Sequence, residues 1–254
     1  MLRTRVMPCL LLKGKGLVKT EKFKNERYVG DPINAVRIFN QKEVDELVLF
    51  DIDSTNKQTP INFSLLEQIA SECFMPICYG GGVKTMADFR KLFYMGIEKV
   101  SVSSLLFEKP DIIKEAVSVY GSQSIVATLD VKQSRFRKKY VVCTHSSKNK
   151  IKMSPVEAAQ YASDLGVGEI ILNTVHRDGT WSGFDSNLVK QVVDSVNIPV
   201  VAAGGAGSLD DIKSVVDDAH ASAVAIGSMA VFQSKDMGVL IKFPSHSELS
   251  QILI

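Results

Sequence analysis

The stretch Met75-Pro-Ile-Cys-Tyr-Gly-Gly-Gly-Val-Lys-Thr-Met-Ala-Asp-Phe-Arg90 recurs with the same pattern as Asn197-Ile-Pro-Val-Val-Ala-Ala-Gly-Gly-Ala-Gly-Ser-Leu-Asp-Asp-Ile-Lys213. In each copy a proline opens a short apolar run, two glycines close it, and an acidic residue begins a helical pattern. The matching positions lie 123 residues apart, close to half of the 254-residue chain. A repeat of this length indicates two duplicated half-domains rather than a solenoid, whose repeats span roughly 20–50 residues.

Apolar runs alternate with helical patterns along the whole chain, and no linker-like change of composition interrupts them. The chain is close to the roughly 250 residues that a (β/α)8 domain needs. We therefore predict one domain over residues 1–254, a single (β/α)8 TIM barrel built as a two-fold half-barrel repeat. Its predicted strands are 5–12, 46–51, 76–80, 98–103, 124–130, 169–174, 198–203 and 221–226, and its predicted helices are 32–40, 62–73, 85–95, 110–119, 154–165, 185–195 and 208–217.

Two segments are too long to be simple connections. Residues 13–31 are rich in glycine and lysine, and long loops of this kind are often functional or disordered. Residues 136–152 hold two short strand patterns around a Ser-Ser-Lys-Asn tip, which predicts a small hairpin inserted after the fifth strand.

Composition excludes several classes of function. A formal charge of +2 gives no electrostatic reason to expect nucleic acid as a partner. The apolar run near the N-terminus is too short to cross a membrane, so we expect no membrane association and a cytoplasmic protein. The four cysteines show no paired spacing and are expected to be reduced. Cys143 and His145 alone are too few ligands for zinc, and we expect neither a metal nor a cofactor.

Small residues follow four of the predicted strands, at the end of a barrel where active sites lie. Backbone N–H groups in such loops can surround phosphate oxygens, although glycines there can also serve only to allow tight turns. Two symmetry-related glycine pairs, each followed one unit later by a serine, favour a ligand with a phosphate at each end. The residues expected to bind phosphate are Gly81, Gly82, Ser103, Ser104, Gly204, Gly205, Gly227 and Ser228.

Asp51 and Asp130 each end an apolar run, and we interpret the two runs as matched strands of the two half-barrels. Each aspartate is therefore a candidate general acid or base. Aspartates at such positions also cap helices or brace loops. His176, in a loop at the same end, is a third candidate, although a lone loop histidine more commonly serves only as a hydrogen-bonding group. Trp181 could equally cover the site or pack against a partner.

Four charged residues stand at or just before the starts of predicted strands 1, 2, 4 and 6, which is the opposite end of the barrel. Surface salt bridges are the ordinary explanation for such residues. Their equal numbers of cations and anions also permit a charged ring across the barrel floor. The four residues are Arg5, Glu46, Lys99 and Glu169.

With these features in place, the sequence resembles the HisF family, the cyclase subunit of imidazole glycerol phosphate synthase. The resemblance covers nearly the whole chain and rests on an ordered series of motifs. They are Arg5, Cys9-Leu10, Lys13, Lys19, Gly30-Asp31-Pro32, Asp45-Glu46-Leu47-Val48, Asp51-Ile52, Gly80-Gly81-Gly82, Asp130, Arg177-Asp178-Gly179-Thr180, Ser182-Gly183 and Gly204-Gly205-Ala206-Gly207.

The resemblance implies a lyase of histidine biosynthesis whose floor docks on a HisH-type glutaminase and receives ammonia through the barrel axis. It implies that Arg5, Glu46, Lys99 and Glu169 form the ammonia gate. Ammonia would then attack a phosphorylated small-molecule substrate, a bisphosphorylated ribulosyl ribotide, at the mouth. Lys19 would be the cation of the substrate loop, and Asp178 and Gly179 would join the phosphate-binding set.

One catalytic position departs from the family pattern. The family uses a carboxylate on strand 1 and another on strand 5; Asp130 fills the second position, but Leu11 stands at the first. Leucine cannot transfer a proton, so one role is unfilled unless Asp51, Asp53 or His176 takes it. His176 and Trp181 also replace residues that are usually acidic and polar.

This departure is similar to HisF-like paralogues of bacterial surface-polysaccharide clusters. Those proteins are thought to pass ammonia to a sugar amidotransferase for lipopolysaccharide sugar amidination. Two alternatives stay open: an authentic cyclase of histidine biosynthesis, and a phosphate-binding ammonia conduit without catalysis of its own.

Overall fold

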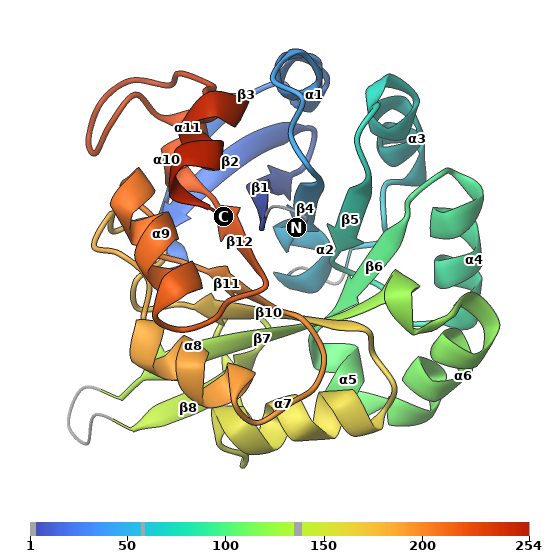
Figure 1. Cartoon of the computed structure of the whole chain (residues 1–254). Coiled ribbons are helices and arrows are strands. Elements are labelled where there is room, and N and C mark those ends of the chain that lie inside the picture. The colour runs from blue at the N-terminus through green and yellow to red at the C-terminus, as the bar shows by residue number, and fades with distance from the viewer. Residues whose placement is uncertain (1–3, 57–58, 135–138, 254) are drawn as a thin grey trace.

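Eight parallel strands form a closed barrel in the computed structural model, which describes residues 4–56, 59–134 and 139–253. Each strand pairs with its neighbours in parallel, and the pairing of the fifth with the sixth closes the ring. Helices surround the ring, so the predicted (β/α)8 barrel is confirmed (Figure 1). In barrel order the strands are β1 (Arg5–Lys13), β4 (Leu47–Asp51), β5 (Ile77–Gly80), β6 (Lys99–Val102), β7 (Ile125–Gln133), β10 (Glu169–Thr174), β11 (Val200–Ala203) and β12 (Ala223–Ile226).

The outer helices bury apolar faces against the barrel. In the first, Asp31 accepts a hydrogen bond from the Asn34 backbone N–H, and Pro32 occupies the first turn, where it costs no hydrogen bond. The same helix buries Ala35 and Phe39. The predicted helices correspond to α1 (Pro32–Gln41), α3 (Phe63–Glu72), α4 (Met86–Tyr94), α6 (Pro110–Tyr120), α7 (Pro155–Asp164), α8 (Ser186–Val193) and α9 (Leu209–Asp217).

The sequence repeat is also a repeat of structure. The bounds of β5 and α4 lie 123 residues before those of β11 and α9. Both helices begin with a reciprocal capping box, Thr85 with Asp88 in one and Ser208 with Asp211 in the other. The two glycine-rich stretches therefore adopt one local structure twice, at related positions of the barrel.

One sequence expectation about the repeat is wrong. Asp51 ends β4, the second strand of the first half, whereas Asp130 lies on β7, the first strand of the second half. The strand that corresponds to β7 is β1, which carries Leu11. Asp51 and Asp130 are therefore not matched strand ends, because the shared apolar-then-aspartate pattern does not fix a position within the half-barrel.

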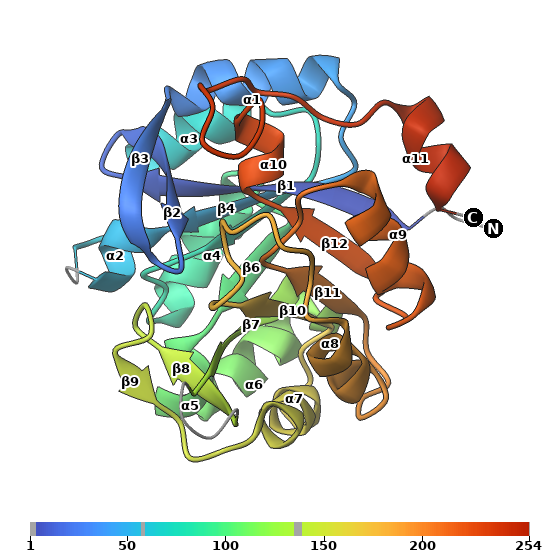
Figure 2. The same cartoon turned by 90° about the vertical axis from the view of Figure 1, so that its left-hand side faces the viewer.

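The two ends of the barrel differ in how they are covered. Both chain ends lie at the end where the strands begin, which faces the viewer in Figure 1 and lies on the right of Figure 2. We call this end the floor and the opposite end the mouth. Apolar side chains fill the interior between them. They include Met7, Val48, Cys78, Val126, Ile171 and Val201.

Two antiparallel hairpins extend from the mouth (Figure 2). In place of the predicted long connection, β2 (Gly16–Glu21) pairs with both β1 and β3 (Lys24–Gly30). Most of β3 is exposed, so it lacks the alternation of apolar and polar residues by which strands are predicted. In the predicted insertion, β8 (Tyr140–Thr144) pairs with β7 and with β9 (Asn149–Lys150); residues 136–138 of that prediction lie outside the described residues.

Among the residues that the structure describes, four further α-helices were not predicted. All are short, with five, five, four and seven residues, which is too few for a helical pattern to stand out. They are α2 (Ile52–Asn56), α5 (Ser104–Glu108), α10 (Ser228–Val231) and α11 (His246–Ile252). Within the described ranges, every helix falls short of the length and apolarity that a bilayer span requires.

Candidate functional site

Two neighbouring cavities occupy the barrel mouth, and one glycine pair lines each of them. Gly81 and Gly82 line the first cavity, and Gly204 and Gly205 line the second. The wall between the cavities is shared and largely apolar. It is formed by Leu11, Phe23, Phe50 and Asn173.

The first cavity combines backbone groups with hydroxyls. Gly81 has φ = +119°, and a Cβ on it would lie 2.2 Å from the backbone oxygen of Asp51. No other residue type fits there without displacing backbone. Ser103 and Ser104 line the same cavity, and the Ser103 hydroxyl oxygen is buried without a hydrogen-bond partner among the described residues. A buried hydroxyl left in this way is suited to a ligand that supplies the missing partner.

The second cavity holds a buried cation. The Lys19 residue on β2 is only 5% exposed, and no carboxylate of the described residues lies within 4.0 Å of its Nζ. A Cβ on Gly227 would lie 2.4 Å from that Nζ, so the glycine makes room for the ammonium. Gly204, Gly205 and Ser228 line the same cavity. A buried ammonium without an ion-pair partner favours an anionic ligand.

Asp178 and Gly179 also line the second cavity. Burial raises the pKa of Asp178, while Lys19 and a 3.4 Å hydrogen bond from the Thr20 hydroxyl lower it. A Cβ on Gly179 would lie 2.4 Å from the backbone oxygen of Thr20, which ties this loop closely to β2. Both residues therefore reach the cavity against the same strand that carries Lys19.

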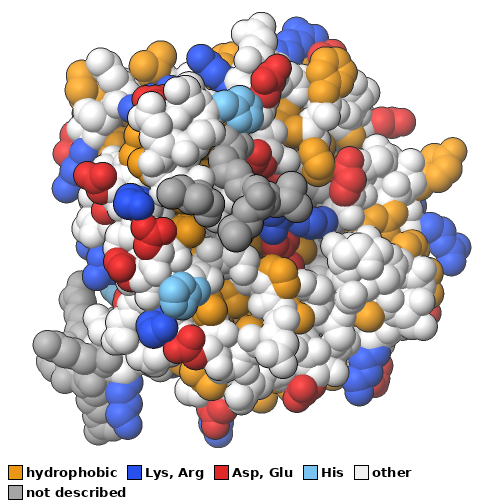
Figure 3. Space-filling view, in the orientation of Figure 1, with side chains coloured by type: hydrophobic (Ala, Val, Ile, Leu, Met, Phe, Trp, Pro, Cys, Tyr) orange, Lys and Arg blue, Asp and Glu red, His pale blue; other side chains and the backbone are white. Residues whose placement is uncertain are grey.

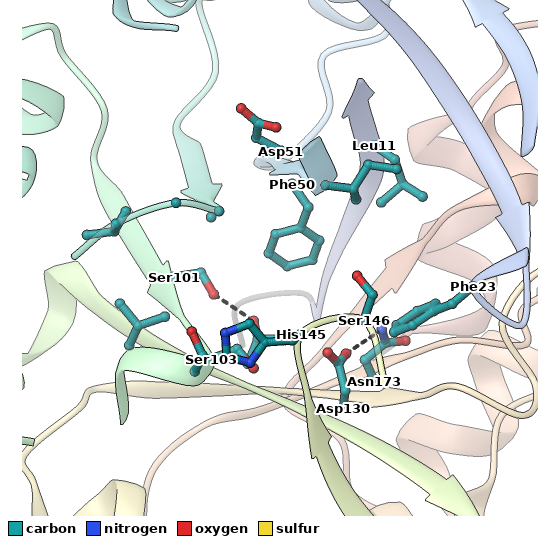
Figure 4. A pocket seen from close by; sticks show the side chains of 18 of the residues that line it. Leu11, Phe23, Phe50, Asp51, Ser101, Ser103, Asp130, His145, Ser146 and Asn173 are labelled. Atoms are coloured by element: carbon teal, nitrogen blue, oxygen red, sulfur yellow. Dashed lines mark hydrogen bonds between the residues drawn. The ribbon is translucent and has the colours of Figure 1, made fainter. Parts of the chain in front are cut away.

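Asp130 lines the first cavity from β7. Burial raises its pKa to about 7, the hydrogen bond from Asn173 Nδ2 to its Oδ1 (2.9 Å) lowers the pKa, and the Asp178 carboxylate raises it (Figure 4). A carboxyl group with a pKa near neutrality can both take up and release a proton at physiological pH. Asp130 is thus equipped for acid-base chemistry.

Leu11 lines the same cavity as Asp130 but brings no titratable group to it. Beside it the Phe50 ring projects into the middle of the cavity (Figure 4). Leu11 and Phe50 are register partners on adjacent strands. The centre of the mouth is therefore apolar, with the groups able to bind anions on either side.

The Asp51 carboxylate points away from the centre of the cavity in Figure 4. Its Oδ1 accepts hydrogen bonds from the backbone N–H groups of Asp53 and Ser54, both 3.0 Å long, and its Oδ2 accepts one of 2.6 Å from the Ser54 hydroxyl. These contacts hold the first turn of α2, which is the helix-capping arrangement. Asp51 lines the cavity, yet both of its carboxylate oxygens already accept hydrogen bonds from Asp53 and Ser54.

His176 is not among the residues that line the two cavities. Its Nε2 lies 3.4 Å from Asp185 Oδ2, which also accepts a hydrogen bond of 2.8 Å from the Tyr140 hydroxyl. Burial lowers the pKa of His176, and Asp185 opposes that shift. Trp181 packs against the hydrophobic core. These residues link the loop after β10 to β8 and to the start of α8.

The four charged residues of the floor come together in one cluster, which we call the floor ring. Glu46 accepts from Arg5 Nη1 (2.5 Å) and from Lys99 Nζ (2.8 Å), and Glu169 accepts from Arg5 and from Lys99 Nζ (2.8 Å). Each cation thus joins both anions. Figure 3 shows charged side chains at the centre of this face. Glu46 and Glu169 are only 4% and 5% exposed, so the floor ring is no ordinary surface ion pair.

The sequence did not single out several residues that line the cavities. Phe50 and Asn173 each lie one position before the end of a strand, and alternation along a strand could have placed them inside the barrel. Cys9, Phe23, Glu26 and Ser146 also line the cavities, as does His145, which the sequence had weighed only for zinc. The second hairpin was predicted after the fifth strand, but the sequence did not show which of its residues reach a cavity.

Comparison with known proteins places this architecture among histidine biosynthesis proteins, whose family model matches residues 5–236. A Pseudomonas aeruginosa protein with the provisional description imidazole glycerol phosphate synthase subunit hisF2 is 47% identical over 98% of this chain and 99% of its own. A Vibrio vulnificus protein with the provisional description subunit hisF3 is 45% identical over 100% and 97% of the two chains. A Leptospira borgpetersenii protein provisionally described as subunit HisF is 42% identical over 98% of both.

Proposed function

Because the chain belongs to the HisF family of imidazole glycerol phosphate synthase subunits, we propose that it is the barrel subunit of a glutamine-dependent complex. Its floor takes ammonia from a HisH-type glutaminase, and its mouth uses that ammonia on a small molecule with two phosphate groups. No cofactor enters the proposal.

The two-sided mouth is the single observation on which this proposal most depends. Gly81, Gly82, Ser103 and Ser104 offer backbone N–H groups and hydroxyls on one side. Across the apolar wall, the second cavity offers Lys19, Asp178, Gly179, Gly204, Gly205, Gly227 and Ser228. A ligand with an anion at each end matches this distribution, since each anion would find donors while its middle lies against Leu11 and Phe50.

The floor ring supports delivery of ammonia from the other end. Arg5, Lys99, Glu46 and Glu169 stand where the axis meets the floor, and the residues between them and the mouth are apolar or small. Neutral ammonia passes through such an interior more readily than ammonium, because a charge in an apolar interior is costly. We propose that the floor ring is the entrance gate and lies at the glutaminase contact.

The mouth chemistry is proposed to differ from that of an ordinary cyclase. Asp130 remains as an acid-base group, but Leu11 provides none, and Asp51 and His176 are held by other partners. We therefore propose that ammonia serves a related amidotransfer reaction, with a sugar amidotransferase of surface-polysaccharide synthesis as the further partner. Four free cysteines are in keeping with a cytoplasmic complex.

An authentic cyclase is the second candidate, favoured by Asp130 with its pKa near 7. It would convert the ribulosyl ribotide with ammonium salts alone, at a rate that Asp130→Asn abolishes. The divergent subunit would bind a HisH-type glutaminase and turn over little ribotide. A conduit without catalysis would bind phosphates and the glutaminase and gain no activity from any change at the mouth.

Leu11→Asp separates these three functions. In the divergent subunit, the restored carboxylate faces the same cavity as Asp130 and should raise ammonia-dependent cyclisation by at least ten-fold. Leu11→Asn is the matched control, because the asparagine side chain has the shape of aspartate but cannot exchange a proton. It should leave the cyclisation rate unchanged. Rapid turnover by the unmodified chain would favour the authentic cyclase, whereas no gain in Leu11→Asp would favour the conduit.

A further inference from the structure

The tip of the β8–β9 hairpin reaches over the first cavity. His145 and Ser146 line that cavity together with Ser103 and Ser104. His145, Ser146 and Ser147 have φ values of +52°, +54° and +67°, so three consecutive residues other than glycine adopt the left-handed conformation. This turn brings an imidazole to the side of the cavity where the donors for an anion gather (Figure 4).

The contacts of the His145 ring favour one of its two tautomers. The side-chain amide of Asn149 lies 3.4 Å from Nδ1, and its nitrogen can only donate. The Thr144 hydroxyl lies 3.2 Å from the same nitrogen and can either donate or accept. With Nδ1 as the acceptor both contacts are satisfied, which places the ring hydrogen on Nε2. Nε2 in turn lies 3.4 Å from Oε1 of Glu108, at the end of α5. The ring thus presents a donor to a carboxylate.

We propose that His145 is a ligand-binding residue of the first cavity and that its Nε2 exchanges Glu108 for an anionic group of the ligand. This inference rests on the proposed function, because it assigns a further donor to one of the two proposed anion sites. Glu108 is a partner that can leave, since its side chain is 54% exposed and its carboxylate can return to water. The buried Ser103 hydroxyl, which has no partner among the described residues, lies in the same cavity and would bind the same group.

Glu108 and His145 then have opposite effects on anion binding. Without a ligand the carboxylate occupies the imidazole donor and repels a phosphate nearby. A merely structural ion pair would behave differently, because loss of either partner would loosen the hairpin and weaken binding alike. The signs of the two effects therefore distinguish a ligand-binding histidine from a structural one.

The test is titration of the full chain with inorganic phosphate, monitored by the backbone amide signals of Gly82 in the first cavity and Gly205 in the second. His145→Asn suits the left-handed backbone, which asparagine tolerates. It should weaken phosphate binding at the first cavity about ten-fold and leave the second unchanged, since charge-assisted hydrogen bonds are the strong ones. Glu108→Gln should tighten binding at the first cavity two-fold or more. His220→Asn is the matched control, because His220 is exposed, lies outside both cavities and has a left-handed φ of +56°; it should change neither site.

Different results would overturn the role of His145 and the proposal of two anion sites. Phosphate binding at both cavities, with a first-cavity Kd in His145→Asn within two-fold of the unmodified chain, would overturn the role of His145 alone. Equal weakening in His145→Asn and Glu108→Gln would also overturn it and leave a structural pair. If neither amide signal responds to phosphate in the unmodified chain, the proposal of two anion sites at the mouth is wrong. The proposed role of His145 is then wrong as well.

Discussion

Leu11 on β1 and Asp130 on β7 line one cavity from the first strands of the two half-barrels. Only Asp130 can carry a proton, so the mouth has lost its two-fold symmetry at the place where symmetry would supply a second acid-base group. The floor, by contrast, keeps two cations and two anions in a closed ring. The chemistry of the mouth can therefore have diverged while the entrance stayed intact.

The raised pKa of Asp130 predicts a stability that falls with pH. Below about pH 4 the folded and unfolded states both hold the proton; between about pH 4 and 7 only the folded state keeps it, so stability decreases as pH rises through this window. Asp130→Asn should therefore stabilise the fold by about 2–4 kcal/mol at pH 8 and by little at pH 4. Urea unfolding at both pH values measures this. Asp194→Asn, at an exposed aspartate, should show no such difference; an equal effect of Asp130→Asn at both pH values would contradict the burial of its charge.

Lys19 should lower the stability of the fold and bind phosphate in the second cavity. Its buried ammonium has no carboxylate of the described residues within 4.0 Å, and only the more distant Asp178 offsets its burial. Lys19→Met should therefore raise the free energy of unfolding by about 1 kcal/mol. The same change should abolish phosphate binding at Gly205 and spare the site at Gly82. Unfolding and phosphate titration of one sample test both effects, and a variant that is less stable yet binds phosphate normally would contradict this role.

Much of the fold could be predicted from the sequence, because each barrel strand contains a short apolar run and helical patterns separate the runs. Gly81 and Gly205 could be placed at the mouth for the same reason. The first hairpin could not be placed, because most of β3 is exposed and its position depends on pairing with β2. The role of Asp51 could not be predicted either, because an aspartate at the end of a strand gives the same sequence pattern whether it faces a substrate or caps α2.

Gly81 should tolerate no side chain. In Gly81→Ala the new methyl group would lie 2.2 Å from the Asp51 backbone oxygen at a left-handed φ, which should cost about 2–4 kcal/mol. Gly238→Ala is the matched control, because nothing lies within 4 Å of a Cβ there, and its cost should stay under about 0.5 kcal/mol. Thermal unfolding compares the two, and equal melting temperatures would show that the Gly81 loop can move aside.

The floor ring should contribute more to stability than a surface ion pair. Lys99→Met leaves two nearly buried glutamates to share Arg5, which should cost about 2–3 kcal/mol. Lys213→Met removes the exposed Lys213–Asp217 pair and should cost under about 0.5 kcal/mol. Chemical denaturation measures both, and similar costs would show that water screens the floor ring as it does the surface.

The most direct test of the central claim is sedimentation of this chain with a HisH-type glutaminase. The account predicts a one-to-one complex that Glu46→Lys disrupts, because it places three cations around Glu169, and that the mouth variant Leu11→Asn leaves intact. Circular dichroism would confirm that both variants are folded. Absence of a complex with the unmodified chain, or a complex lost in Leu11→Asn and retained in Glu46→Lys, would contradict the claim that ammonia enters at the floor.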